Sequence, residues 1–327
     1  MKYHNRSGRA FSLTLAASFF FSAIILFFLF SDQLTVLPSS LNDPLPNNGH
    51  DHDHDQTHDQ PPQQHEPQPE EKPDANPVFH PEPPSFMEDA FVLHPKDHTY
   101  RKPTLTILQW RVTKELRSPD GVEKDIYLIN GQFPGPTIEA MSGDELQINV
   151  FNDIKNDDQD GIAIHWHGLS MKGANEMDGA VGVTQCTIAS GQNFTYNFRI
   201  EDTQHGTYWY HAHSAVKRAD GLFGGLIIHS PSKDENQSEL KKHGYGVDKL
   251  LLVGDWYHKP AKTALDWYQD SDHFGYEPAP DSLLINGRGA YTCANAVKAW
   301  PVKCTQVDPP IMDFADGPVR LRIVNTG

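Results

Sequence analysis

The sequence predicts an all-β chain in which a β-sandwich domain is followed by an incomplete second β domain. Three observations support this prediction. From about residue 93, short stretches rich in β-branched and aromatic residues recur, with Gly, Pro and Asn turns between them. No helical pattern of comparable clarity occurs in residues 96–230. A long apolar run and a proline-rich stretch come before these strands, and neither resembles part of a packed domain.

The N-terminus has the pattern of a membrane anchor. Residues 1–9 carry three cationic side chains, and residues 10–30 contain no charge. About 20 apolar residues cross a bilayer core as a helix. The run ends Phe28-Leu29-Phe30, which is unlike a signal-peptide cleavage site. We expect a single-pass transmembrane signal anchor at 10–30, a cytoplasmic tail at 1–9 and an extracellular or lumenal catalytic part. The alternative is a cleaved signal and a secreted chain.

Residues 31–95 contain thirteen of the 25 prolines and almost no aliphatic periodicity. Such a stretch buries too little apolar surface to fold, so we expect a disordered linker. Inside it, His50-Asp51-His52-Asp53-His54-Asp55 is followed by His58 and His65. This tract is either a metal-collecting segment or a polar low-complexity linker, and its composition favours the second reading.

The first domain is expected over residues 96–230. Alternation of apolar and polar side chains predicts its strands, with turns at 130–131 and 134–136. The expected strands lie at residues 104–116, 125–129, 145–150, 162–168, 194–200, 206–213 and 221–229.

A polar linker is expected at 231–246, and a partial second domain at 247–327. Strand patterns occur at 249–256, 282–286 and 319–324. A sandwich needs more strands than these, so we expect the sequence to be an incomplete chain. The aromatic residues near the start of this domain are expected in its core. They are Trp256, Tyr257, Trp267 and Tyr268.

Charge and cysteine content limit the possible partners. The formal net charge of −16 argues against nucleic acid, because phosphate contacts need a basic surface. The three cysteines form no Cys-x-x-Cys unit, so no thiolate zinc site is expected. Cys293 and Cys304 either form a local disulfide or remain free thiols. Asn193 and Asn236 lie in N-glycosylation motifs.

Two histidine pairs, His165-Trp166-His167 and His211-Ala212-His213, are the strongest chemical signal. Alternate residues of a strand share a face, so neighbouring strands would bring four imidazoles together. Imidazole binds copper, zinc, iron and nickel, and the aromatic neighbours indicate a dry site. A lone histidine is more often structural or on the surface. We expect that of the unpaired ones: His205, His229, His243, His258 and His273.

From about residue 100 onward the chain resembles the N-terminal part of multicopper oxidases, the group of laccases, ascorbate oxidases and ferroxidases. The resemblance is closest to fungal laccase-like enzymes. The matching motifs are Asn130–Ile138, His165–Gly168, Met177–Gly179, Thr184–Cys186, Gly206–Ser214, Asp220–Leu222, Gly225–Ile228, Gly254–His258 and Leu284–Gly287.

This resemblance implies cupredoxin-like domains and a copper-dependent reduction of O2 to water, driven by oxidation of small substrates such as phenols. It assigns His165 to a type 2 copper, and His167, His211 and His213 to the paired type 3 coppers. Asp178 matches an acid that helps to move protons to oxygen, although a Met-Asp-Gly turn alone would also explain it. The family's type 1 copper lies in a third domain with a His-Cys-His stretch, which this sequence lacks.

Two further features of the family lie outside this sequence. The partner of the cysteine that matches Cys186 lies near the family's far C-terminus, and the acid that binds phenols lies beyond Gly327. Residues 1–327 alone are therefore expected to be colourless with copper bound and inactive toward substrate.

The sequence also bears on three other functions. Fungal iron oxidases carry a Glu before the Asp-Gly, where this chain has Ala219 after Lys217 and Arg218, so phenols are favoured over Fe²⁺. A catalytically inactive copper-binding fragment is the second alternative. A zinc hydrolase needs an open zinc site and a general base, and four imidazoles fit that poorly.

Overall fold

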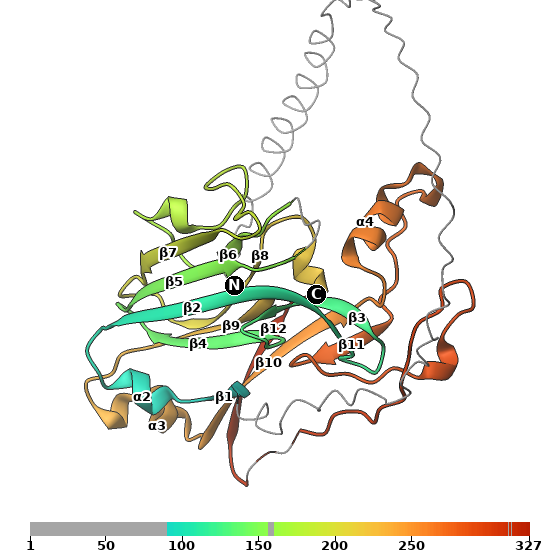
Figure 1. Cartoon of the computed structure of the whole chain (residues 1–327). Helices are drawn as coiled ribbons and strands as arrows, with labels where there is room; N and C mark the ends of the chain where they lie inside the picture. The colour runs from blue at the N-terminus through green and yellow to red at the C-terminus, as the bar shows by residue number, and fades with distance from the viewer. Residues whose placement is uncertain (1–89, 156–159, 313, 315) are drawn as a thin grey trace, which may run out of the picture. The chain divides into compact units, whose positions relative to one another are not determined.

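A computed structural model describes residues 90–155, 160–312, 314 and 316–327 (Figure 1). The strands are β1 (Val92–Leu93), β2 (Leu105–Arg117), β3 (Lys124–Ile129), β4 (Gly135–Met141), β5 (Glu145–Asn152), β6 (Ile164–His167), β7 (Asn193–Arg199), β8 (Gly206–Ala212), β9 (Phe223–His229), β10 (Val247–Trp256), β11 (Ser282–Ile285) and β12 (Val319–Asn325). The α-helices are α2 (Pro95–Thr99), α3 (Glu239–His243) and α4 (Ala261–Gln269). Short 3₁₀ turns lie between several of them.

Strands β2 to β9 form two four-stranded sheets, ordered β3-β2-β5-β7 and β4-β9-β8-β6 (Figure 1). Alternate side chains of both sheets meet in one core, which includes the fully buried Trp166, Tyr196 and Tyr210. The predicted all-β sandwich is therefore confirmed, and each strand expected in residues 96–230 is present within three residues at either end. The sequence pattern does not predict strand β4, because its first residues, Gly135-Pro136, are typical of a turn.

Residues beyond the sandwich form one further sheet, here called the second sheet, which is centred on β10. Strand β12 runs parallel along one edge of β10, while β1 and β11 pair antiparallel with its beginning and its end. The expected disordered linker 31–95 is wrong at its C-terminal end, because residues 92–93 form strand β1 and Pro95 begins helix α2. Phe91 and Leu93 are buried in the apolar cluster that also contains Leu250 and Leu252. Burial of these two side chains explains why residues 91–93 are folded although they lie within the proline-rich stretch 31–95.

The sandwich and the second sheet share this cluster. Along β3, Tyr127 and Ile129 face the sandwich core, whereas Ile126 and Leu128 face the second sheet. Strands β3 and β9 are buried on both faces, so their sequences are nearly continuous apolar runs. The outer face of the β4-β9-β8-β6 sheet is thus an internal surface where it meets β10.

Three features of residues 231–327 differ from the expectation. The expected linker 231–246 contains α3, which Ser238 caps by accepting from the Lys241 N–H. Helix α4 was not expected. Trp256 is buried, but Trp267 is half-buried on α4 and Tyr268 is 40% exposed, so the predicted aromatic core is wrong for Tyr268. At nine residues, α4 is too short for a helical period to stand out.

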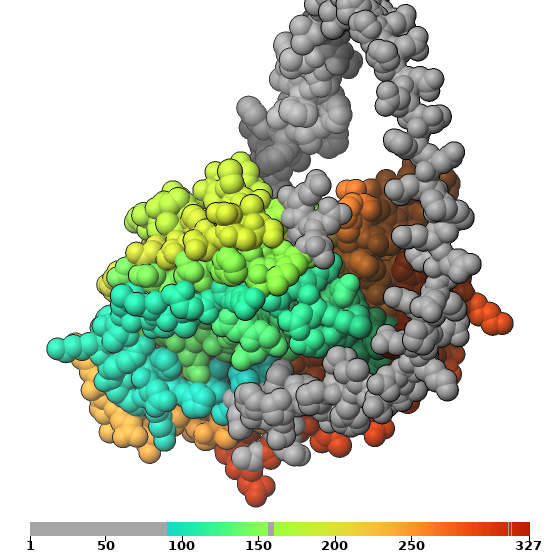
Figure 2. Space-filling model, in the orientation of Figure 1, coloured from blue at the N-terminus to red at the C-terminus, as the bar shows by residue number. Residues whose placement is uncertain are grey.

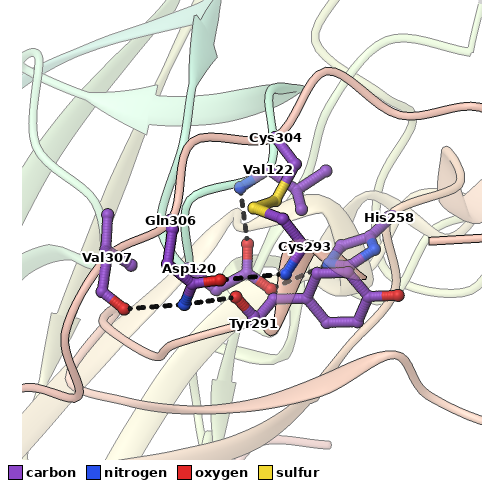
Figure 3. Close-up of a disulfide and its surroundings, with 8 residues drawn as sticks. All are labelled: Asp120, Val122, His258, Tyr291, Cys293, Cys304, Gln306 and Val307. Carbon is purple, nitrogen blue, oxygen red and sulfur yellow. Dashed lines mark hydrogen bonds and ion pairs between the residues drawn. A yellow bond between two sulfur atoms is a disulfide. The ribbon is translucent and has the colours of Figure 1, made fainter. Parts of the chain in front are cut away.

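Cys293 and Cys304 form a disulfide, which settles the alternative left open by the sequence (Figure 3). Beside it, the Cys293 N–H donates to Gln306 Oε1, at 3.1 Å. Next to this loop, His258 Nε2 lies 2.8 Å from the carboxylate of Asp120, and both side chains are buried. The pair joins the end of β10 to the sandwich, so His258 is structural, as expected of an unpaired histidine.

Within the described residues, no helix has the length and apolar character to span a membrane. The expected anchor at 10–30, the tail at 1–9 and the histidine–aspartate tract lie outside the described residues. Asn193 and Asn236, which open the two glycosylation motifs within the described residues, are exposed.

Asp144 gives the stability of the fold a pH dependence. Burial opposes its charge, but hydrogen bonds from Arg101 and from the Thr104 and Met141 N–H groups lower its pKa overall. A lowered carboxyl pKa stabilises the fold above the unfolded-state pKa, about 3.9, and this stabilisation is lost as pH falls below that value. We expect Asp144→Asn to lower the urea midpoint at pH 7, and the difference from the parent to shrink below about pH 4. A constant difference from pH 7 to pH 3 would contradict this.

Candidate metal centre

The two histidine pairs lie on neighbouring antiparallel strands. His165 of β6 is directly opposite His211 of β8, and Trp166 is opposite Tyr210. Trp166 and Tyr210 point into the sandwich core. Because side chains alternate, the histidines point to the outer face of the sheet, the one that Trp209 shares with the second sheet.

Three of the four predicted ligands converge. Ligand atoms of His165, His167 and His211 all lie within 4.8 Å of one another. Nδ1 of His167 and Nε2 of His211 are 3.2 Å apart. Two nitrogens bonded at about 2.0 Å to one tetrahedral ion lie about 3.3 Å apart, so this pair has the spacing of shared ligands. His213 lies at the edge of the group, exposed, with its ring centroid 5.4 Å from that of His165.

The hydrogen bonds of His165 and His211 place the lone pair of each ring on Nε2, and the lone pair of His211 faces Nδ1 of His167. Nδ1 of His165 donates to the Asp178 carbonyl at 2.7 Å, and Nδ1 of His211 donates to the Ala212 carbonyl at 2.9 Å. Each bond fixes the tautomer in which Nε2 is unprotonated, as is usual for metal-binding histidines. Burial, together with the positive Arg218 and neighbouring imidazoles, lowers the pKa of His167 and lowers that of His211 to about 4. Both rings are therefore neutral at pH 7, the form that binds a metal.

The Met177–Gly179 turn holds Asp178 against His165. The Asp178 carboxylate lies 3.3 Å from the Nδ1 atom whose proton its own carbonyl accepts. The indole N–H of Trp166 donates to the Met177 carbonyl at 3.1 Å and ties the turn to β6. Gly179 has a φ of +82°, and a Cβ there would lie 1.9 Å from the Ile164 carbonyl oxygen. Glycine is thus the residue that lets this turn approach β6.

Trp209 and Arg218 border the centre. The sequence predicts aromatic side chains around the histidine pairs, but its spacing does not predict that Arg218 lies beside Trp209. The Trp209 ring lies 4.4 Å from that of His211 and 5.3 Å from that of His167. The guanidinium carbon of Arg218 lies over the Trp209 ring, 5.9 Å from its centroid. The indole limits the rotation of both imidazoles, and the guanidinium adds positive charge beside them. Trp209 lies on β8 and Arg218 in the 3₁₀ turn before β9. Spacing in the sequence does not show that these two elements bring the side chains together.

The donor set fits a soft-to-borderline transition metal. Imidazole nitrogen suits copper, zinc, iron and nickel, and the charge-neutral rings require no proton to be displaced. Fold and donor set together are those of a class of β-sandwich proteins in which the outer face of one sheet presents histidines able to hold a metal.

Two sequence-family models, both described as multicopper oxidase, match residues 111–233 and 248–327. Together they cover more than half of the chain. The chain belongs to the multicopper oxidase family, as the motifs predicted, and copper is the metal that this family implies.

Similar proteins agree with this membership. Laccase-1 of Cryptococcus neoformans var. grubii is 37% identical over 227 residues, which are 68% of this chain and 34% of that protein. Dihydrogeodin oxidase of Aspergillus terreus is 42% identical over 182 residues, 56% of this chain and 28% of that one. The crystal structure of a Botrytis aclada laccase matches 71% of this chain and 40% of its own, with 33% identity and a TM-score of 0.57. This likeness confirms the cupredoxin-like fold. The chain spans about a third of the length of the curated relatives that it matches.

Proposed function

We propose that the chain is part of a copper-dependent oxidase of the laccase type, which couples oxidation of small phenol-like substrates to reduction of O2 to water. The observation that carries this proposal is the convergence of His165, His167 and His211 on one face of the sandwich sheet. Bound copper ions would supply one-electron transfer and the O2 chemistry. The protein residues hold the ions, fix the ring orientations and deliver protons.

In the assignment we favour, His165 binds the type 2 copper, and His167, His211 and His213 bind the type 3 pair. His213 would reach its ion by a small movement of the loop after β8, where it is exposed. We propose that a further domain supplies the remaining cluster ligands and the type 1 copper. The outer face of the β4-β9-β8-β6 sheet, which carries the four histidines, is the surface where such a domain would complete the centre.

Asp178 is placed to serve proton transfer. Its carboxylate is half-exposed and lies beside the His165 ring, so it can exchange protons with solvent at one side and face the centre at the other. Its carbonyl meanwhile keeps the His165 proton on Nδ1. One residue would thus perform two tasks: the backbone orients a ligand, and the side chain moves protons.

The chain's cations favour phenols over Fe²⁺ as the electron donor. Arg218 lies beside the copper-facing indole of Trp209, and Lys217 is buried with its amine 3.8 Å from Asp160. Positive charge next to the centre does not assist the approach of a divalent cation. No observation in the described residues favours the ferroxidase or zinc-hydrolase alternatives.

We further propose that the protein is held at the membrane by residues 10–30, with residues 31–95 as most of the stalk and the described domains outside the cytoplasm, where the Cys293–Cys304 disulfide is stable. A secreted form is the alternative. Retention in the membrane pellet after alkaline extraction tests the anchor, and release into the supernatant would contradict it.

Copper affinity tests the centre itself. We expect His211→Asn to weaken copper binding by more than the 10–100-fold typical of losing an outer-shell partner, because a direct ligand is removed. Competition with a copper chelator measures this. His243→Asn, which changes an exposed histidine on α3, is the matched control and is expected to bind as the parent does. Equal copper affinity in His211→Asn and His243→Asn would refute the centre.

A further inference from the structure

A second group of histidines lies at the other end of the same sheet. Glu139 is on β4 and His229 ends β9. Their neighbours Ile138, Ala140 and Ile228 point into the sandwich core, so Glu139 and His229 point to the outer face. Along β9, His229 is six residues beyond Phe223, which pairs with His211, a separation of about 20 Å. This group is therefore distinct from the first centre.

Helix α2 covers these two side chains and adds a third. One ligand atom of His98, on α2, lies within 4.8 Å of ligand atoms of Glu139 and His229. The rings of His98 and His229 are stacked, with centroids 5.1 Å apart. Figure 2 shows the α2 segment, in cyan, beside the light-orange segment that contains α3, along one edge of the view. The group thus lies where the chain enters the sandwich.

The Glu139 carboxylate is the centre of the group. Its Oε2 accepts from His229 Nε2 and from the backbone N–H of His94, both at 2.8 Å. Its Oε1 lies 3.1 Å from His94 Nδ1. The His229 side chain is only 3% exposed, whereas that of His94 is 59% exposed. Two imidazoles and one carboxylate therefore surround one small volume, and His94 borders it at the Glu139 carboxylate.

Charge also suits a cation here. Burial opposes ionisation of Glu139, but its hydrogen bonds to His229 and His94 lower its pKa overall, so the carboxylate is ionised. Burial and the neighbouring His229 lower the pKa of His98, which keeps that ring neutral. Arg101 lies 3.2 Å from His98 Nδ1, but its charge is balanced by two hydrogen bonds to Asp144. Arg101 can release His98 and keep both of these bonds.

We propose that His98, Glu139 and His229 bind a divalent transition-metal ion with the ligand preference of zinc, with His94 or water as the fourth ligand. Two imidazoles and one glutamate form an established zinc donor set. The ligand atoms of the three residues all lie within 4.8 Å of one another, and those of Glu139 and His229 are already 2.8 Å apart. Ligand atoms around one tetrahedral ion lie about 3.3 Å apart, so His98 on the short helix α2 is the ligand that must move closer. The ion would fasten α2, and with it the entry of the chain, to the sandwich.

Zinc stoichiometry tests this site. In every sample, the histidines of the tract at 50–65 are replaced by glutamine, so that they do not bind the metal. Competition with a colorimetric chelator then counts tightly bound Zn²⁺. We expect His98→Asn and Glu139→Gln each to lose one equivalent relative to the parent, and the exposed control His243→Asn to lose none.

Two further measurements separate this site from the first centre and from misfolding. In a chain that carries His165→Asn and His211→Asn, Zn²⁺ is still expected to raise the Tm, and adding His98→Asn is expected to abolish that rise. His98 is only half-buried, so its substitution leaves the fold intact, which the Tm without zinc verifies. The proposal is overturned if His98→Asn and Glu139→Gln bind as much zinc as the parent. The proposal is also overturned if only the His165→Asn/His211→Asn variant loses zinc.

Discussion

Replacing Arg322 with methionine is expected to destabilise the fold by about 3–5 kcal/mol. Arg322, on β12, makes three hydrogen bonds to the carboxylate of Asp248 on β10, at 2.9 to 3.1 Å. It also donates to Thr207 Oγ1 on β8, at 3.2 Å, and so links the second sheet to the sandwich. The Asp248 side chain is 0% exposed and that of Arg322 4% exposed. Methionine fills similar volume but leaves a buried carboxylate without its main partner.

Urea unfolding at pH 7 measures this loss, and an exposed ion pair supplies the control. Lys262 and Asp266 are four residues apart on α4, and both side chains are more than half exposed. Lys262→Ala is expected to cost no more than about 0.5 kcal/mol. Arg320 lies 4.0 Å from Asp248 and compensates for part of the lost charge, which favours the lower end of the range. A loss below about 1 kcal/mol in Arg322→Met would show that the pair contributes little.

Strand periodicity explains why so much of the sandwich was predictable. In β5, β7 and β8, apolar side chains alternate with polar or functional ones, and the same alternation places both histidine pairs on one face. The pairing of His165 with His211 follows once β6 and β8 are neighbours. Period alone could not reveal strand β4, which begins at Gly135, or helix α4, because a turn motif and a nine-residue helix carry weak patterns.

The sites show where sequence reasoning ends. The first centre has a local signal, since each pair occupies three consecutive residues. The His98–Glu139–His229 group has none, because its members are 41 and 90 residues apart and only the β4–β9 pairing and the packing of α2 unite them. Taken by itself, His229 is expected to be structural or on the surface. Its buried hydrogen bond to Glu139 agrees with a structural role. The position of His213 depends on the loop after β8, and no strand pattern determines that loop.

The turn that carries Asp178 leads to the second prediction, on Gly179. We expect Gly179→Ala to destabilise the fold by about 2–5 kcal/mol and to weaken copper binding about 10–100-fold. The added Cβ would lie 1.9 Å from the Ile164 carbonyl oxygen and 2.9 Å from the His165 nitrogen. These are backbone atoms of β6 and cannot rotate away, so the turn must retreat from the strand. Asp178 would retreat with it, and His165 would lose the carbonyl that fixes its tautomer.

Gly182 provides a matched control, because it has nearly the same backbone conformation in open space. Its φ is +79°, and an added Cβ there would meet no atom within 4 Å. Gly182→Ala therefore carries only the left-handed strain, about 1–2 kcal/mol, and should leave copper affinity unchanged. Chemical unfolding and chelator competition on both variants separate strain from steric clash. Equal losses of stability and equal copper affinity in the two variants would contradict this prediction. They would show that the close approach of the turn to β6 does not position Asp178 and that other contacts orient His165.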